Sequence, residues 1–414
     1  MVSPTGAKSR ILYLDSLRAL AALYVIMHHA MLQYYWDVTK HLSKAERIVV
    51  GLFSDGHIAV GIFIVLSGFS LTLAVTKNNL NIKGGSTKFF KRRIIRIVPP
   101  YYAALLLCLL LTRLFIGNKT GTLWDTSIPP TSWDIATHFL FIHDFFVSSI
   151  AKINYSFWSI SVECRLYLFF PLLILLWRKK GPWMALLFSF IATVVFSAAL
   201  LVARGLNPDI SLSRAGVSPY IILFSLGMIA ADLAFSTKTR AKEIREHCSK
   251  LNTWGVVAFF AFSLVSYKVV SAAVKTSSLS ADDMKFVTQE IKDILVGFIA
   301  AIFLFVCAVD HQSNQKKTWA LRLLNWRPLV FIGTFSYSLY LIHPPLLQLL
   351  CQYILPSVHF STLTKAGLLL TLGTVVVMVL SRLFFLLFER PFLVPGRRRR
   401  VRDTEILAAQ NPAP

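Results

Sequence analysis

The chain has few cysteines, and they are not arranged to cross-link the fold or to bind a metal. It has 5 cysteines in 414 residues, an odd and scattered set with no spacing typical of metal ligands. We therefore expect no disulfide framework and no zinc or other metal site. A cleavable signal peptide is not expected either, since Asp15 and Arg18 interrupt the first apolar stretch. That stretch is predicted to stay as a membrane anchor.

Charged residues are scarce, and acidic ones most of all. Only 15% of the residues are charged, with 20 Asp and Glu against 43 Lys and Arg, whereas 55% are hydrophobic and the mean hydropathy is +0.61. Many apolar runs approach the roughly 20 residues that cross a bilayer as a helix. We expect an all-α polytopic membrane protein with about ten transmembrane helices. The predicted spans are 13–33, 52–75, 98–116, 157–177, 183–203, 217–236, 253–272, 291–309, 329–351 and 366–388.

The net charge of +23 follows the topology of these spans and does not indicate a nucleic-acid partner. The alternate loops 77–97, 178–182, 237–252 and 310–328 carry seven, three, five and four Lys and Arg, and the opposite loops carry one to three each. Positive loops stay in the cytoplasm. Both termini are therefore predicted to be cytoplasmic, and the arginines after Pro395 are expected to contact anionic membrane lipids.

No internal repeat is strong enough to predict the inverted halves that many transporters have. The longest stretch between spans is 117–156, which is expected on the outer side, and 136–146 is a candidate interfacial piece. The other loops are too short to fold alone. We expect one membrane domain over 1–395 and a basic, then polar, cytoplasmic tail over 396–414. The oligomeric state is left open.

Arg18 and His29 are eleven residues apart in the first span. Eleven residues turn a helix through three turns plus roughly 20° and rise about 16 Å, so both side chains share one face at different depths. Ionisable groups inside a span are costly and mark candidate functional sites. Asp15, three residues before Arg18, is expected to orient it as an ion pair.

A second cluster, Arg93-Ile94-Ile95-Arg96-Ile97-Val98-Pro99-Pro100, lies at the cytoplasmic entry to the third span. The two prolines are expected to break a short interfacial helix from the span. Arg93 and Arg96 then share a face and can chelate a phosphate, although a plain positive-inside anchor has the same pattern. Two arginines that can bind phosphate near the membrane edge, with a histidine about 16 Å deeper, match the length of a cofactor such as coenzyme A.

Five motifs together resemble the membrane-bound acyltransferase-3 family, and they occur in the family's order over most of the chain. They are Asp15-Ser16-Leu17-Arg18 with ten residues before His29, Val60 to Phe69, Arg93 to Pro99, Trp158-Ser159-Ile160-Ser161-Val162-Glu163, and Tyr337 to Pro344. Members of this family O-acylate surface polysaccharides and other extracytoplasmic or lipid-linked acceptors. The resemblance implies an integral O-acyltransferase in a bacterial inner or plasma membrane.

The resemblance also implies roles for the matching residues. His29 is the implied catalytic base with Arg18 as its partner, while Arg93 and Arg96 hold acyl-CoA, with acetyl-CoA expected, on the cytosolic side. Glu163 is expected to bind an acceptor hydroxyl or to orient the histidine. The sequence departs from the family where Cys164 and Arg165 follow Glu163 and where Gly61 replaces a frequent aspartate.

Further candidates lie near the expected acceptor entrance. Trp158 and Ser161 belong to the fourth motif, and His57 lies at the outer start of the second span, so all three are candidates for binding a carbohydrate or glycolipid acceptor. Tyr340 and His343 form a stripe with Tyr337, although such a stripe more often packs than binds. Pro344 and Pro345 are expected to interrupt the ninth span.

Two other functions compete with acyl transfer. A transporter of an acyl group or glycan would also keep an intramembrane histidine, but it would not need the cytosolic arginine pair. A structural or sensory protein with a degenerate site would explain the changes at Cys164 and Arg165, but not the retained arginines and His29.

Overall fold

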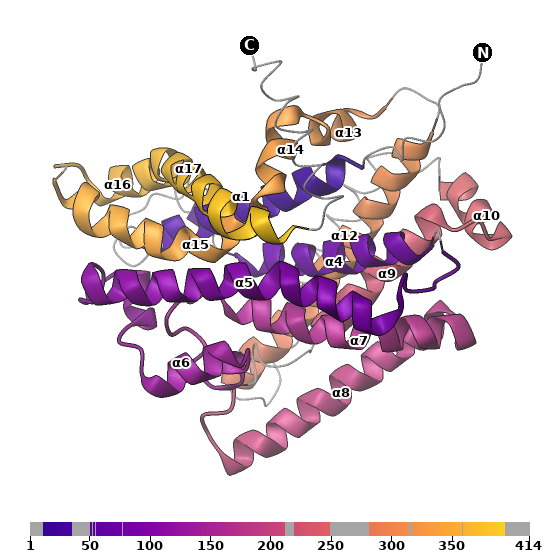
Figure 1. Ribbon diagram of the computed structural model, residues 1–414, viewed down its shortest axis with the longest axis horizontal. Helices are drawn as coiled ribbons and strands as arrows, with labels where there is room; N and C mark the ends of the chain where they lie inside the picture. Colours follow the sequence, from indigo (N-terminus) through magenta and orange to yellow (C-terminus); the bar gives the residue numbers. More distant parts are fainter. Residues whose placement is uncertain are drawn as a thin grey trace.

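The computed structural model describes residues 11–34, 50, 51, 53, 55–76, 78–211, 219–248, 281–313, 317–357 and 359–393. Within these ranges the protein is all-helical, and the only β-type pairing is an isolated bridge between Phe146 and Ile210. The longer helices (Figure 1) are α1 (Tyr13–Leu32), α4 (His57–Thr76), α5 (Gly85–Leu114), α7 (Trp158–Lys180), α8 (Pro182–Leu206), α9 (Tyr220–Phe235), α12 (Ala281–Gln312), α15 (Ser336–Leu349) and α17 (Thr374–Phe384). The shorter ones include α6 (Ser132–Phe139), α10 (Thr239–Cys248), α13 (Trp319–Leu324), α14 (Arg327–Thr334), α16 (Thr362–Leu368) and the 3-10 turns η1 (Leu123–Ser127) and η2 (His143–Phe145).

The all-α class is confirmed, but the count of ten spans and the sides of the termini are not. Six described helices are long and apolar enough to cross a membrane, or up to eight if each of two bent helix pairs is one span. Helix α1 is outside this set because two charges and two histidines lower its hydropathy. The predicted span 253–272 and the tail 396–414 lie outside the described residues.

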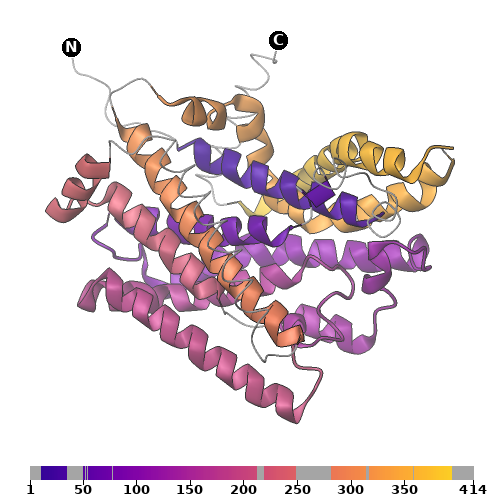
Figure 2. The same cartoon turned by 180° about the vertical axis from the view of Figure 1, so that it is seen from behind.

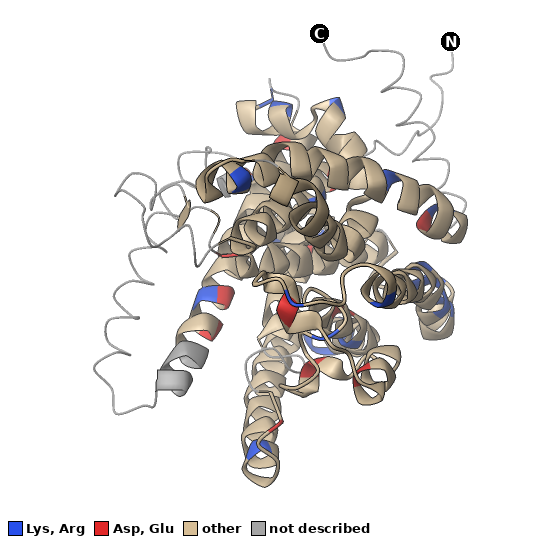
Figure 3. Ribbon diagram, turned by 90° about the vertical axis from the view of Figure 1, so that its left-hand side faces the viewer, with Lys and Arg blue, Asp and Glu red and all other residues tan. Residues whose placement is uncertain are grey.

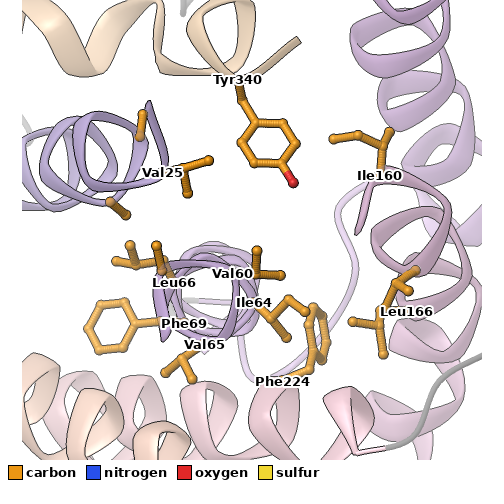
Figure 4. Close-up of a cluster of buried hydrophobic side chains, with 14 of the residues drawn as sticks. Val25, Val60, Ile64, Val65, Leu66, Phe69, Ile160, Leu166, Phe224 and Tyr340 are labelled. Carbon is orange, nitrogen blue, oxygen red and sulfur yellow. The ribbon is translucent and has the colours of Figure 1, made fainter. Parts of the chain in front are cut away.

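Helix α4 lies at the centre of the bundle. Its side chains point in all directions and meet Val25 of α1, Ile160 and Leu166 of α7, and Phe224 of α9 (Figure 4). The crossing with α9 is close because it is built on glycine: a Cβ at Gly68 would overlap the carbonyl oxygen of Phe224. Small residues allow such close packing of membrane helices.

Helix α1 packs against α4, α14 and α15, so the helix with Arg18 and His29 is held from three sides. The contact with α14 also depends on a glycine, since a Cβ at Gly333 would overlap the carbonyl oxygen of Asp15. Figure 2 shows α1 from behind, with α12 running diagonally across that face. The depth of each polar residue on α1 is thus fixed by its neighbours.

Helix α5 is continuous through Pro99 and Pro100, so the expected break there is wrong. Each proline removes one backbone N–H from a helix and so deprives a carbonyl one turn earlier of its donor. The Tyr337 hydroxyl donates to the nearby Ile97 carbonyl oxygen at 3.1 Å. This contact from α15 adds a donor to the turn that the prolines weaken.

The expected interruption of the ninth span at Pro344 and Pro345 is also wrong, since α15 runs through both. The bend of 74° lies instead between α14 and α15, at Phe335. The prolines withhold the N–H groups that would bond the carbonyls of Tyr340 and Leu341. Side chains supply these donors, and the candidate active site is built around one of them.

Helix α8 lies along one edge of the bundle in both Figure 1 and Figure 2, and only 17% of its most apolar 18-residue window is buried. Large apolar side chains such as Val195 and Val202 are more than half exposed on it. Charged residues are sparse along the helices (Figure 3). An apolar, uncharged outer surface is what a lipid environment requires.

Candidate active site

Arg18 is held at one end of α1 by its own helix and by α4. Its guanidinium donates to the Asp15 carboxylate at 3.1 Å and to the Ser70 hydroxyl at 2.6 Å. The ion pair expected between Asp15 and Arg18 is confirmed. Because Asp15 is buried and Arg18 is only 19% exposed, the guanidinium has a fixed position.

Glu163 lies beside the arginines. One of its carboxylate oxygens accepts hydrogen bonds from the Ser67 hydroxyl at 3.2 Å and from the Tyr167 hydroxyl one helical turn along α7. The Arg93 guanidinium lies 5.6 Å from the centre of the Tyr167 ring. Among the described residues the hydrogen bonds of Glu163 do not reach His29. Glu163 therefore lies with Arg18 and Arg93 at one end of the site, the arginine end.

Three arginines gather at this end. Arg18 interacts electrostatically with both Arg96 and Glu163, and Arg93 does so with Arg96 and Glu163. Arg93 and Arg96 face inward, whereas the intervening isoleucines at 94 and 95 are 57% and 39% exposed. Three cations face the carboxylates of Asp15 and Glu163, which leaves an excess of positive charge.

The buried Nε of Arg93 has no hydrogen-bond partner among the described residues. A buried donor without a partner carries a free-energy cost that an anionic oxygen would remove. The arginine end is therefore suited to a ligand with phosphate groups.

His29 lies at the other end of α1, against α15. Its Nδ1 is 2.8 Å from Nε2 of His343, and the two rings stack with centroids 5.0 Å apart. The ring of Tyr155 packs on His29 at 4.8 Å. The neighbouring His28 turns away, and its Nδ1 lies 2.7 Å from the carbonyl oxygen of Phe53. His29 is thus the histidine whose ring nitrogen contacts His343.

His343 is completely buried, and its Nδ1 lies 2.8 Å from the carbonyl oxygen of Tyr340 and 3.2 Å from that of Leu339. The Tyr340 hydroxyl donates to the carbonyl oxygen of Ser156 at 2.9 Å and lies 2.6 Å from the Ser159 hydroxyl. Figure 4 shows the Tyr340 ring directed between α4 and α7. The predicted stripe therefore joins α15 to α7 and α1 through polar contacts.

Trp158 and His57 form a second aromatic pair near this end. Their rings stack with centroids 5.2 Å apart, and His57 Nδ1 lies 3.9 Å from the buried Asp293 carboxylate of α12. Trp158 also packs against Tyr220 at 5.9 Å. The pair thus links the N-terminal starts of α4 and α7 to α9 and α12.

Ser161 faces a different part of the protein. It is buried, and its hydroxyl lies 3.4 Å from Nδ1 of His143 in the segment between α5 and α7. There His143 stacks on His138 with ring centroids 3.8 Å apart, and Arg165 forms an ion pair with Asp144. Ser161 therefore lines the contact with this segment, whereas Trp158 lies on the His57 side of α7.

The stacked histidines predict a loss of stability in acid. Burial lowers the pKa of His138 from its usual 6.5 to about 4, and burial together with the neighbouring His138 lowers the pKa of His143. Below pH 6.5 the unfolded chain binds more protons at these rings than the folded one, so acid favours unfolding. We expect the Tm in detergent to fall by several degrees between pH 6.5 and 4.5.

His138→Phe keeps the stacked ring but removes one titrating group. It is expected to lower the Tm at pH 7.5, because the Asp134 carbonyl oxygen loses the His138 ring as a donor and keeps the Thr137 hydroxyl, yet to show a smaller further loss on acidification than the unmodified protein. Equal losses in both proteins would contradict the assignment.

Several site residues were not identified from the sequence. Ser70 lies one turn from Ser67 on α4, and Tyr167 one turn from Glu163 on α7, so helical spacing from known candidates is the signal for both. Tyr155 and Asn154 precede α7 in a loop, where no periodicity applies. Within the described ranges, no group of three or more His, Cys, Asp or Glu is placed to hold a metal ion.

A comparison with protein families assigns the chain to a known family. The model of the acyltransferase-3 family, described as an acyltransferase domain, matches residues 11–385. The chain belongs to this family. The match includes every helix described above from α1 to α17, with both ends of α1 and their partners on α5, α7 and α15. Family membership confirms the resemblance seen in the five motifs, and this is a family of acyltransferases.

Three similar curated proteins come from bacteria. The putative peptidoglycan O-acetyltransferase YrhL of Bacillus subtilis is 27% identical over 344 residues, which cover 81% of this chain and 48% of that protein. The O-acetyltransferase OatA of Staphylococcus aureus is 25% identical, over 82% of this chain and 51% of that protein. The peptidoglycan O-acetyltransferase OatA of Listeria monocytogenes is 24% identical, over 81% and 49%.

This chain spans about half the length of the curated relatives it matches. No solved structure is similar enough to count as a match. The apolar helices together with these relatives support a multi-pass bacterial membrane protein.

Proposed function

We propose that this family member transfers an acetyl group from cytosolic acetyl-CoA to a hydroxyl of a carbohydrate or glycolipid acceptor. The observation that carries the proposal is the surroundings of α1: Arg18 lies near Arg93 and Arg96 of α5 at one end, and at the other end His29 pairs with His343 of α15. The separation of eleven residues from Arg18 to His29 corresponds to a rise of about 16 Å along the helix. A donor with phosphates at one end and a thioester at the other suits that separation.

The phosphates of coenzyme A are assigned to Arg93 and Arg96, with Arg18 adding positive charge. Arginine binds phosphate oxygens through paired N–H donors, and the buried Nε of Arg93 has no other partner among the described residues. Glu163, which accepts from Ser67 and Tyr167, is assigned to this donor end, where it helps to hold the arginines in place.

The chemistry is assigned to the other end. The acceptor oxygen attacks the thioester carbonyl carbon while His29 takes the hydroxyl proton, the carbon–sulfur bond breaks, and the proton passes from His29 to the departing sulfur. General base catalysis of this kind needs an imidazole within hydrogen-bond reach of the hydroxyl. The bonds and protons of this reaction balance without a metal ion and without a redox step.

The acceptor is assigned to the outer side of His29. Trp158 and His57 offer stacked rings, and a flat aromatic surface suits a sugar ring. Tyr340 adds a hydroxyl between α4 and α7. Ser161 lies on the far side of α7, so we give it a structural place beside His143. The relatives named as peptidoglycan O-acetyltransferases make peptidoglycan glycans the first acceptor to test.

The test uses the purified chain in liposomes with acetyl-CoA labelled in the acetyl group. Peptidoglycan fragments and neutral polysaccharides are supplied as acceptors on the opposite side of the membrane. We expect free CoA to appear together with alkali-labile label in the acceptor. Label that crosses the vesicle wall without forming an ester would support a carrier instead, and absence of CoA release with every acceptor would contradict acyl transfer.

A further inference from the structure

We infer that His343 is a positioning residue that fixes the tautomer of His29, so that Nε2 of His29 is the basic nitrogen. This inference rests on the proposed role of His29 and replaces the substrate-binding role that the sequence suggested for His343. Its basis is a chain of hydrogen bonds that runs from the backbone of α15 through both imidazole rings.

The chain begins at Pro344. In an α-helix the N–H of residue 344 bonds the carbonyl of residue 340, but proline has no N–H. The carbonyl oxygen of Tyr340 is therefore left without its helical donor. Buried carbonyls of this kind almost always find another partner. The partner here is Nδ1 of His343, at 2.8 Å.

Pro345 has the same effect one residue later. It frees the carbonyl oxygen of Leu341, and the side-chain amide of Asn154 donates to that oxygen at 3.0 Å. Asn154 is completely buried, and its own oxygen accepts from the backbone N–H and hydroxyl of Ser156. Both carbonyls freed by the prolines are thus satisfied by side chains, which explains why α15 stays continuous.

A carbonyl oxygen only accepts hydrogen bonds, so the proton on His343 must be at Nδ1. The neutral ring then has its lone pair at Nε2. Nδ1 of His29 lies 2.8 Å from that atom, and with His343 neutral it must be the donor. The proton of neutral His29 is then at Nδ1, which makes Nε2 its basic nitrogen.

The arrangement has a direct consequence for catalysis. The opposite tautomer of His29 would present an N–H at Nε2 and could not take a proton there. A partner that holds an imidazole in the correct tautomer increases the rate without contacting the substrate, as the buried carboxylate does in serine proteases. His343 has that relation to His29. His343 is itself held by the neutral backbone carbonyl of Tyr340 and not by a charged group.

Two substitutions at His343 separate positioning from simple packing. His343→Leu fills the space but removes the acceptor, whereas the side-chain amide oxygen of His343→Gln can occupy the place of Nε2. We expect His343→Leu to lower kcat for acetyl transfer by about 10- to 100-fold, with KM for acetyl-CoA unchanged, because an orienting hydrogen bond is lost. His343→Gln should recover a large part of that loss.

A merely structural role would instead lower the Tm and the yield of both variants and leave kcat per folded molecule unchanged. Equal kcat in His343→Leu and the unmodified protein would overturn the inference, as would equal losses in the leucine and glutamine variants. If His343→Leu stays active while His29→Ala does not, the proposed function stands and only the positioning role fails.

The tautomer is also measurable without activity. Protein labelled with ¹⁵N in its histidine rings and embedded in lipid bilayers gives separate nitrogen signals for protonated and unprotonated positions, and comparison with His29→Gln assigns the His29 signals. At pH 8 we expect protonated Nδ1 and unprotonated Nε2 at His29. The reverse pattern would overturn the inference even if the acceptor for acyl transfer were not found.

Discussion

Replacement of His29 by alanine is expected to lower kcat for acetyl transfer by about 10²- to 10⁴-fold, the usual contribution of a general base. The KM for acetyl-CoA should change little, because the arginines of α5 assigned to its phosphates lie beside Arg18, three helical turns from His29 along α1. A loss confined to kcat marks an interaction made in the transition state and not in binding. The measurement is initial rates of CoA release in liposomes over a range of acetyl-CoA concentrations.

His28→Ala is the matched control, since it removes the neighbouring imidazole from the same helix. His28 Nδ1 lies against the Phe53 carbonyl and its ring lies close to Gly56, so its loss is expected to cost stability but not chemistry. In size-exclusion chromatography both variants should elute at the same volume as the unmodified protein, which shows that they are folded. Full activity of His29→Ala, or equal losses of kcat in the two variants, would remove His29 from the mechanism.

Local spacing was enough to predict much of the arginine end. The i, i+3 relation of Asp15 to Arg18 gave the observed ion pair, and the same spacing in α5 placed Arg93 and Arg96 on the inward face. These are properties of single helices, where sequence separation determines direction. The helices themselves follow from long apolar runs, which leave little choice of secondary structure in a membrane.

The partners of His29 and Glu163 depend on tertiary contacts. His343 is 314 residues from His29 along the chain, and no periodicity links them. Glu163 was expected beside an acceptor or His29, yet the direction of α7 past α4 brings it to Ser67 and the arginines. The order of the motifs along the chain identifies them, but it does not show which motifs contact one another in the folded protein.

The predicted helix breaks at the two proline pairs are wrong for a physical reason. Proline breaks a helix when the carbonyl that it frees has no other partner. In α15 the freed carbonyls of Tyr340 and Leu341 face His343 and Asn154, so the helix continues. Such compensation comes from side chains placed by the fold, and the proline positions alone do not reveal it.

Replacement of Arg93 by glutamine is expected to raise the KM for acetyl-CoA by about 10- to 100-fold while kcat changes little. A hydrogen bond between charged groups contributes about 1.5–3 kcal/mol, and each 1.4 kcal/mol is a factor of about ten in affinity. The guanidinium lies against the Phe89 and Tyr167 rings at 5.6 Å, which fixes its direction. Initial rates at varied acetyl-CoA separate the two constants.

Lys91→Gln is the control, because it removes a positive charge from the exposed face of the same helix, two residues away. Its effect on KM should be small and should disappear at high salt, which screens exposed charges. A donor without the 3′-phosphate extends the test. If Arg93 contacts that phosphate, removing the guanidinium and the phosphate together weakens donor binding by less than the sum of the two single effects, because the effects of interacting groups are not additive.

The two variants together test the division of α1 into a donor end and a reaction end. Arg93→Gln should change KM and spare kcat, whereas His29→Ala should change kcat and spare KM. A carrier without group transfer has no thioester step, so neither variant would alter CoA release in it. If Arg93→Gln lowered kcat alone, the phosphates would have to bind elsewhere, and the separation of Arg18 from His29 along α1 would no longer correspond to the length of the donor.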